Sequence, residues 1–147
     1  MNFEKFVLYR INTVPAKTQT DQEARRSVNL EIFLEYELQA SSRYCRYLSI
    51  VMLKSAGNGS SNFKEFLSDC IRTCDTSFAY GNYLAILMGE TDEQSSALAI
   101  NRYRHFIRSK GLKIQFASVT YPRDGKTLEE LHRILMGRIE DPNGAKY

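Results

Sequence analysis

Apolar residues recur along the chain at two spacings, and these spacings separate predicted helices from predicted strands. Leu30, Phe33, Leu34 and Leu38 lie three or four residues apart, which predicts a helix capped by Asn29 and running to about residue 43. Residues 48–53 are apolar nearly throughout, which is typical of a strand buried on both faces. The chain therefore begins its regular pattern with a helix followed by a core strand.

The remainder of the chain continues this alternation. The pattern predicts a second helix over 62–74, a hairpin over 77–88 with its turn at 81–82, a third helix from Thr91 or Asp92 to about 110, a strand over 112–121, and a final helix after the capping box Thr127/Glu130. The order is helix, strand, helix, hairpin, helix, strand, helix. It predicts an α/β fold, an α+β sandwich around a mixed or antiparallel sheet.

Polar segments bound this predicted domain. Residues 1–27 mix apolar positions such as Phe3 and Phe6 with a polar stretch, so we assign them to an N-terminal arm that docks on the domain or joins a partner. The domain itself is expected over 28–138, and residues 139–147 are expected to form a polar C-terminal tail. A chain of 147 residues fits one domain with a sizeable core.

Composition narrows the class of partner. Hydrophobic residues make up 43% and charged residues 25%, as in soluble globular proteins. A net charge of +3 suits an anionic small ligand but is too weak to indicate nucleic acid. The N-terminus lacks a signal-peptide pattern, and no apolar run is long enough to span a bilayer, so we expect a cytoplasmic protein without membrane insertion.

The metal-ligating residue types form no motif. Cys45, Cys70 and Cys74 lack partners at a metal-ligand spacing, so we interpret them as free thiols in a reducing compartment. His105 and His132 lie inside helical patterns, and we assign them surface roles. We therefore expect no metal site and no protein cofactor.

Four short strings, in order, resemble the GGDEF family of diguanylate cyclases. The helix beginning at Asn29 resembles the family's "PNR…F" helix, and residues 75–88 resemble its "D…RYGGDEF" hairpin. Gly89-Glu-Thr-Asp matches its "PETD", and residues 121–131 (YPRDGKTLEEL) are close to its "YPxDGxTxEEL". The resemblance covers about residues 28–138. It implies a GGDEF or nucleotide-cyclase-like fold, with a central mixed sheet flanked by helices.

The departures from the family concern its catalytic positions. A cyclase holds two metal ions through carboxylates at the end of the first core strand and in the hairpin turn. The chain has Lys54 at the first of these positions and Gly81, Asn82 and Tyr83 in the turn. Neutral side chains and a lysine cannot supply these carboxylates. We therefore predict a degenerate GGDEF domain that is not an enzyme and has no catalytic residues.

A second family site is retained. The family's site for its own product, cyclic di-GMP, has an Arg-x-x-Asp motif that ends five residues before the hairpin glycines. Arg72 and Asp75 stand in this register, and the resemblance places a second arginine at Arg102. Arginine can pair with guanine or phosphate, and a carboxylate can accept from the guanine edge. We expect these three residues to bind cyclic di-GMP.

The predicted function is a non-catalytic cyclic di-GMP receptor that signals to a protein partner. The resemblance implies a homodimer or a ligand-bridged dimer as a further expectation. The alternative is a scaffold of the same fold that binds no ligand and acts through protein contacts alone. A residual enzyme with altered chemistry is disfavoured because the sequence shows neither an activated nucleophile nor a metal-binding set.

Overall fold

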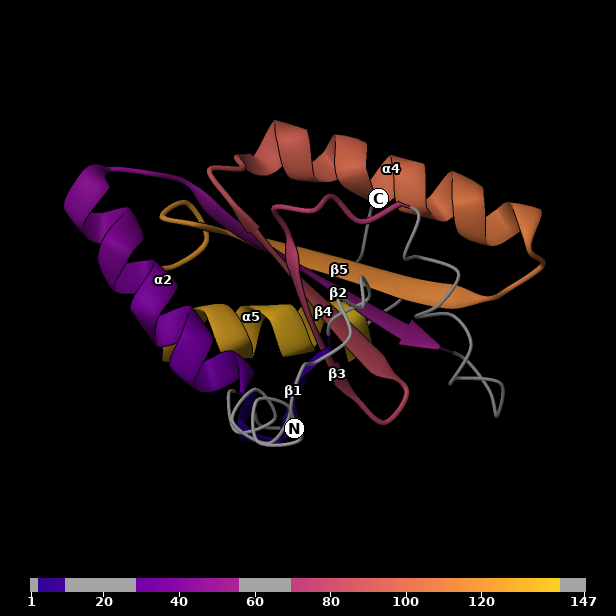
Figure 1. The fold of residues 1–147 in the computed structure, drawn as a ribbon, viewed down its shortest axis with the longest axis horizontal. Coiled ribbons are helices and arrows are strands. Elements are labelled where there is room, and N and C mark those ends of the chain that lie inside the picture. Colours follow the sequence, from indigo (N-terminus) through magenta and orange to yellow (C-terminus); the bar gives the residue numbers. More distant parts are fainter. Residues whose placement is uncertain (1–2, 10–28, 56–69, 141–147) are drawn as a thin grey trace, which may run out of the picture.

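The computed structural model describes residues 3–9, 29–55 and 70–140 (Figure 1). Its elements in chain order are η1 (Phe3–Lys5), β1 (Val7–Tyr9), α2 (Leu30–Tyr44), β2 (Leu48–Ser55), β3 (Thr76–Tyr80), β4 (Tyr83–Gly89), α4 (Glu93–Ser109), β5 (Ile114–Tyr121) and α5 (Leu128–Glu140). None of the helices in these ranges is long and apolar enough to cross a bilayer.

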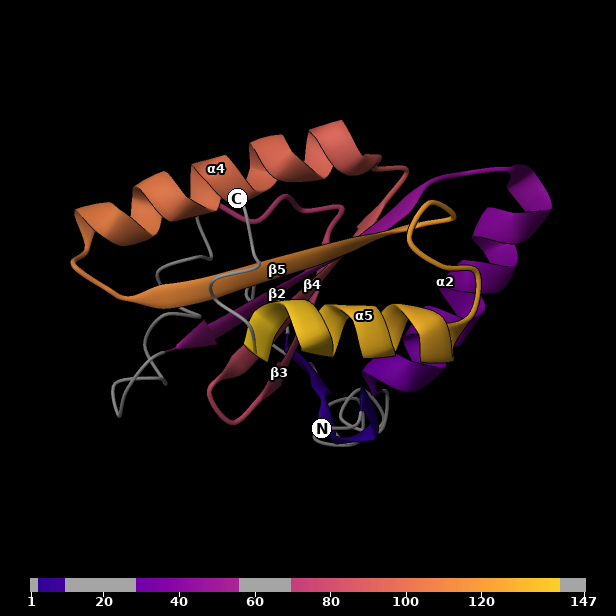
Figure 2. The same cartoon turned by 180° about the vertical axis from the view of Figure 1, so that it is seen from behind.

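The strands form one sheet in the order β1-β3-β4-β2-β5, and every neighbouring pair is antiparallel. Helix α4 covers one face, while α2 and α5 cover the other, as the two opposite views show (Figures 1 and 2). The predicted α/β architecture is confirmed. The described strands form an antiparallel sheet, one of the two types that the sequence pattern left open, rather than the mixed sheet that the resemblance implied.

Strand β2 lies at the centre of the fold. It pairs along its length with both β4 and β5, and residues 48–53 are all buried. Ile50 and Met52 pack toward α2 and α5, whereas Val51 and Leu53 pack toward α4. Successive side chains of a strand point to opposite faces, so a strand covered on both sides needs the continuous apolar run seen in the sequence.

Ser49 is the polar exception in this run. Its hydroxyl lies 2.7 Å from the carbonyl oxygen of Thr91 and 2.8 Å from the Thr120 hydroxyl. A buried hydroxyl is tolerated when it is hydrogen-bonded. Ser49 therefore links the start of β2 to β5 and to the segment that enters α4.

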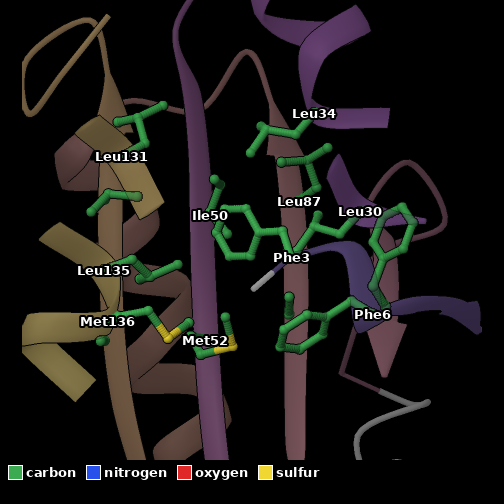
Figure 3. Close-up of a cluster of buried hydrophobic side chains, with 14 of the residues drawn as sticks. Phe3, Phe6, Leu30, Leu34, Ile50, Met52, Leu87, Leu131, Leu135 and Met136 are labelled. Atoms are coloured by element: carbon green, nitrogen blue, oxygen red, sulfur yellow. The ribbon is translucent and has the colours of Figure 1, made fainter. Parts of the chain in front are cut away.

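The N-terminal residues belong to the sheet and the core. Phe3 and Phe6 are 1% and 0% exposed, and β1 pairs with β3 at the sheet edge. Figure 3 shows both rings beside Leu30 and Leu87 in the core on the α2 side. Of the two alternatives for the arm, residues 3–9 adopt the docked one. Residues 10–28 lie outside the described ranges.

Helix ends follow the predicted caps with some differences. Asn29 accepts a hydrogen bond from the Ile32 N–H at 3.0 Å, and Asp92 rather than Thr91 caps α4. The final helix extends to Glu140 because Ile139 is buried in the core, so it continues past the expected start of the tail. Residues 70–74 are turn and bend rather than the end of a helix, and the rest of that predicted helix lies outside the described residues.

The segment resembling the family's "YPxDG" string has a structural role. Asp124 accepts from the Thr120 N–H at 2.8 Å and from Arg138, whose two terminal nitrogens lie 3.0 and 3.3 Å from the carboxylate. Burial by itself would raise the pKa of Asp124, but these hydrogen bonds outweigh it and hold the pKa below its usual value. Arg138 also donates to the Ser118 carbonyl oxygen at 2.6 Å, so this cluster anchors α5 to the edge strand β5.

His132 differs from its predicted surface role. It is half-buried and lies edge-on to the Phe3 ring, with ring centroids 4.4 Å apart. His105 is exposed, as expected for a surface residue.

The docked N-terminal segment leads to a stability prediction. Phe6→Ala is expected to lower the free energy of unfolding by about 3–5 kcal/mol, because it removes a fully buried ring from the core. Val7→Ala, at the adjacent 41%-exposed position, is expected to cost less than about 1 kcal/mol. Urea unfolding of the two variants and the wild type measures this difference. Equal effects would mean that the segment is not part of the core.

Candidate functional site

The Arg-x-x-Asp motif forms a single tight turn. The Asp75 N–H donates to the Arg72 carbonyl oxygen at 3.1 Å, which is the hydrogen bond that closes a four-residue β-turn. The two intervening residues are the centre of that turn, and β3 begins directly after it. The five residues between the motif and the hairpin glycine are β3 itself. The spacing of the motif thus has a structural basis.

The structure brings the three predicted ligand-binding residues together. Arg72 and Arg102 are exposed, and Arg102 comes from α4, with its guanidinium 5.2 Å from the centre of the Tyr103 ring. Both guanidinium groups lie close enough to Asp75 to lower its pKa. Within the described ranges, neither arginine forms a salt bridge with the carboxylate. The result is a half-buried carboxylate with two exposed cations beside it.

Asp75 is held in an unfavourable environment for its charge. Burial raises the pKa of Asp75 above its ordinary value, and the two arginines only partly offset this effect. One carboxylate oxygen is 3.8 Å from the Cys74 sulfur, whereas the buried oxygen Oδ2 has no hydrogen-bond partner among the described residues. A buried carboxylate oxygen without a donor is costly, so this atom is suited to accept a hydrogen bond from a ligand.

Tyr103 is a polar residue of this region that no sequence motif singles out. It is 0% exposed, and its hydroxyl also has no hydrogen-bond partner among the described residues. The pKa of Tyr103 is raised, first by burial and then by the negative charge of Asp75. The sequence contains nine tyrosines. Tyr103 stands at a core position of a predicted helix, so nothing in the sequence distinguishes it from a packing residue.

The positions that the sequence predicts to be former catalytic positions lie at the other end of β3. Lys54 stands opposite Tyr83 in the β2–β4 register, with its ammonium nitrogen 5.4 Å from the centre of that ring. Gly81 takes a φ of +55° at the first central position of the two-residue turn, where type II′ hairpins place glycine. These positions therefore form a cationic and aromatic hairpin end.

Asn82 has a structural role in the hairpin turn. Its side-chain nitrogen donates to the Ser55 carbonyl oxygen at 3.1 Å, while its own carbonyl accepts from the Ser55 N–H at 2.9 Å. A carboxylate could not donate the first of these bonds. In the parts of the chain that the structure describes, no group of three His, Cys, Asp or Glu side chains could hold a metal ion.

A separate hollow of about 550 Å³ lies between the N-terminus of α4 and the end of β5. None of the predicted site residues lines it. Its acidic residues, Asp92 and Glu93, are balanced by Arg123 and Lys126, and Arg123 pairs with Glu93. This balance of charge gives the hollow no preference for an anion.

Comparison with known proteins identifies the fold. No family model and no curated protein matches the sequence. Among solved structures, a DGC protein from Thermotoga maritima matches with a TM-score of 0.66 and 19% identity, over 74% of this chain and 89% of that chain. A sensory box/GGDEF family protein from Caulobacter crescentus matches with a TM-score of 0.62 and 12% identity, over 83% and 93%.

A third match is the diguanylate cyclase SiaD from Pseudomonas aeruginosa, solved in complex with its activator SiaC. Its TM-score is 0.65 at 15% identity, over 76% of this chain and 52% of that chain. The fold is that of GGDEF domains. At these identities the likeness concerns the fold, and the assignment of binding residues depends on the chemistry of the site described above.

The strained environment of Asp75 leads to a prediction about stability. Because the folded-state pKa of Asp75 is raised, ionisation of this group opposes folding at neutral pH, and the penalty disappears as pH falls through that raised pKa. We expect Asp75→Asn to have a higher Tm than the wild type at pH 7, and the difference to shrink on acidification. Thermal unfolding between neutral and mildly acidic pH measures this; a lower Tm for the variant at pH 7 would show that the carboxylate stabilises the fold.

Proposed function

We propose that this chain is a non-catalytic receptor for cyclic di-GMP and that Arg72, Asp75 and Arg102 bind the dinucleotide. The observation that carries the proposal is the convergence of these residues from a turn and a separate helix around a carboxylate oxygen that lacks a donor. Such an arrangement costs stability, which is typical of sites kept for function.

The chemistry of the three side chains matches a guanine nucleotide. An ionised Asp75 can accept from guanine N1–H and N2–H, a donor pair on its Watson–Crick edge. An arginine can donate to O6 and N7 of guanine in a bidentate pair or to a phosphate oxygen. Arg72 and Arg102 are exposed and both lie near Asp75, so one can take the base while the other takes a phosphate.

The absence of cyclase activity is also part of the proposal. Metal-dependent condensation of GTP needs carboxylates to hold the ions that neutralise the triphosphate. Lys54 places a positive charge at one of these positions, and Asn82 uses its amide to hold the end of β2. These two residues support a domain in which the former metal-binding positions stabilise the hairpin instead of holding ions.

Ligand binding would be linked to assembly. A ligand that bridges two copies stabilises the dimer by mass action. We therefore expect a homodimer or a ligand-bridged dimer, which a protein partner in the cytoplasm would recognise. This domain would then act as a sensor whose oligomeric state reports the concentration of cyclic di-GMP.

A scaffold without ligand is the second candidate. Ile32, Tyr36, Tyr44 and Tyr47 are at least half exposed on α2 and the segment after it. Exposed apolar residues that recur on one element favour a protein interface. SiaD, of which 52% matches this fold, has been solved in complex with its activator SiaC, which is an example of a protein partner for a protein that contains the fold.

The receptor proposal predicts saturable binding of cyclic di-GMP by isothermal titration calorimetry. Arg72→Ala and Arg102→Ala are each expected to weaken binding at least about tenfold, because each removes a charge-assisted hydrogen bond. Arg72→Lys should also bind more weakly, since it keeps the charge but loses the planar fork. Arg43→Ala, an exposed arginine at the end of α2, is the matched control and should bind as the wild type does.

Asp75→Asn tests the guanine contact without a folding defect. It keeps the size of the side chain but replaces one acceptor oxygen with a donor, so it should lose affinity while remaining folded. If the wild type shows no heat of binding and no thermal shift at high ligand concentration, the receptor proposal is excluded and the scaffold is favoured. Equal weakening by Arg43→Ala would show that the effect is one of net charge only.

The proposed loss of catalysis is tested separately. The purified chain incubated with GTP and Mg²⁺ or Mn²⁺ is expected to form no cyclic di-GMP by chromatography, because the carboxylates for the ions are replaced. An active diguanylate cyclase assayed in parallel is the control. Product that accumulates in proportion to the concentration of this chain would overturn the non-catalytic assignment and leave the binding site unaffected.

A further inference from the structure

The charges of this protein are divided unevenly along the sequence. Residues 94–123 contain six of the 20 Lys and Arg residues and none of the 17 Asp and Glu residues. This stretch therefore has a formal charge of +6, whereas the rest of the chain has −3. Such asymmetry within one domain is typical of a surface that meets a polyanion.

The fold gathers these charges on the outer face of α4 and the turn that follows it. Arg102, Arg108, Lys110 and Lys113 are exposed, and Arg104 is half-buried with its guanidinium 5.5 Å from the centre of the Phe116 ring. These five residues are called the α4 basic face. The sixth cation, Arg123, lies elsewhere and pairs with Glu93.

Three of the five cations of the α4 basic face lack an acidic partner within salt-bridge distance in the described ranges. Arg102, Arg104 and Arg108 form no salt bridge with any residue in the described ranges. The pKa of Arg104 is lowered, first by partial burial and then by the positive charge of Arg108. The helix dipole favours a cation at a helix C-terminus. This effect accounts for one cation near the end of α4, but not for a group of cations that repel one another.

The same helix exposes an apolar side chain. Leu98 is 70% exposed and precedes Arg102 by one helical turn, so both lie on the outer face. In both views α4 forms the outermost layer on its side of the sheet (Figures 1 and 2). A helix with cations and an exposed leucine along its outer face can lie flat on a surface of anionic headgroups.

We propose that the α4 basic face is a docking surface for an anionic lipid bilayer, with its arginines and lysines on the headgroups and Leu98 inserted among the acyl chains. Single-stranded nucleic acid is disfavoured because stacking needs exposed aromatic rings. Among the described residues, the exposed Phe and Tyr side chains are Tyr36, Tyr44 and Tyr47, which lie on α2 and the segment after it, and α2 covers the opposite face of the sheet. The argument for this surface does not rest on cyclic di-GMP binding, although Arg102 belongs to both proposed sites.

The test is sedimentation of the full chain with vesicles of phosphatidylcholine alone or with about 30 mol % phosphatidylglycerol. The wild type is expected to bind the anionic vesicles only, and less strongly as salt rises. Arg104→Gln/Arg108→Gln should weaken binding about 25-fold, at about fivefold per charge removed. Arg43→Gln/Arg133→Gln removes the same charge from exposed positions on α2 and α5 and should weaken it much less.

Leu98→Ser separates a bilayer from other polyanions. The position is exposed, so the fold should be unaffected, and binding to anionic vesicles should fall about fivefold through the lost insertion. Binding of a duplex DNA of about 20 base pairs, measured by anisotropy, should not respond to this substitution. The proposal is overturned if the wild type fails to sediment with anionic vesicles. It is also overturned if the two double variants lose vesicle binding to the same extent. Tight DNA binding without vesicle binding would instead assign this face to nucleic acid.

Discussion

The burial of β2 between two helical layers is the constraint on which the remaining structure depends. This strand pairs with β4 on one side and with β5 on the other, and its side chains enter both cores. Because both faces must be covered, α4 is required on one side and α2 with α5 on the other. The two turns at the ends of β3 are then positioned by the sheet, because β3 pairs with β4 and β4 pairs with β2.

The two ends of β3 have different relations to stability. At its start, Asp75 is partly desolvated and one of its oxygens lacks a donor, so the turn that holds it opposes folding. At its end, Asn82 and Lys54 form contacts that close the hairpin against β2. A residue retained at a cost to stability is a stronger indication of function than one that satisfies its own neighbours. This contrast is the physical reason to propose ligand binding at the first turn and a structural role for the second.

Arg102 connects the two proposed surfaces. It lies beside Asp75 and also within the α4 basic face, so a dinucleotide bound at the first would add negative charge at the edge of the second. Bilayer attachment and ligand binding would then oppose each other through simple electrostatics. The coupling needs no conformational change, because both sites share a rigid helix that is anchored in the core by Tyr103 and Ile107.

The sequence by itself determined most of the described elements from α2 onward and their order, but not η1 and β1. The unbroken apolar run at 48–53 required a strand covered on both faces, and the caps at Asn29 and Asp92 fixed the starts of two helices through local hydrogen bonds. It also placed Arg72 and Asp75 three residues apart, which is the span of one turn. These features are local, so the spacing of residues along the chain is enough to predict them.

Only the tertiary structure decided the features that join distant segments. The docking of Phe3 and Phe6 depends on a pocket formed by α2 and the sheet, and the role of Asn82 depends on the Ser55 carbonyl across the hairpin. The desolvation of Asp75 and the burial of the Tyr103 hydroxyl arise where a turn meets a helix nearly thirty residues later in the chain. Burial and hydrogen-bond satisfaction are properties of the packed chain, so no local pattern of residues could have determined them.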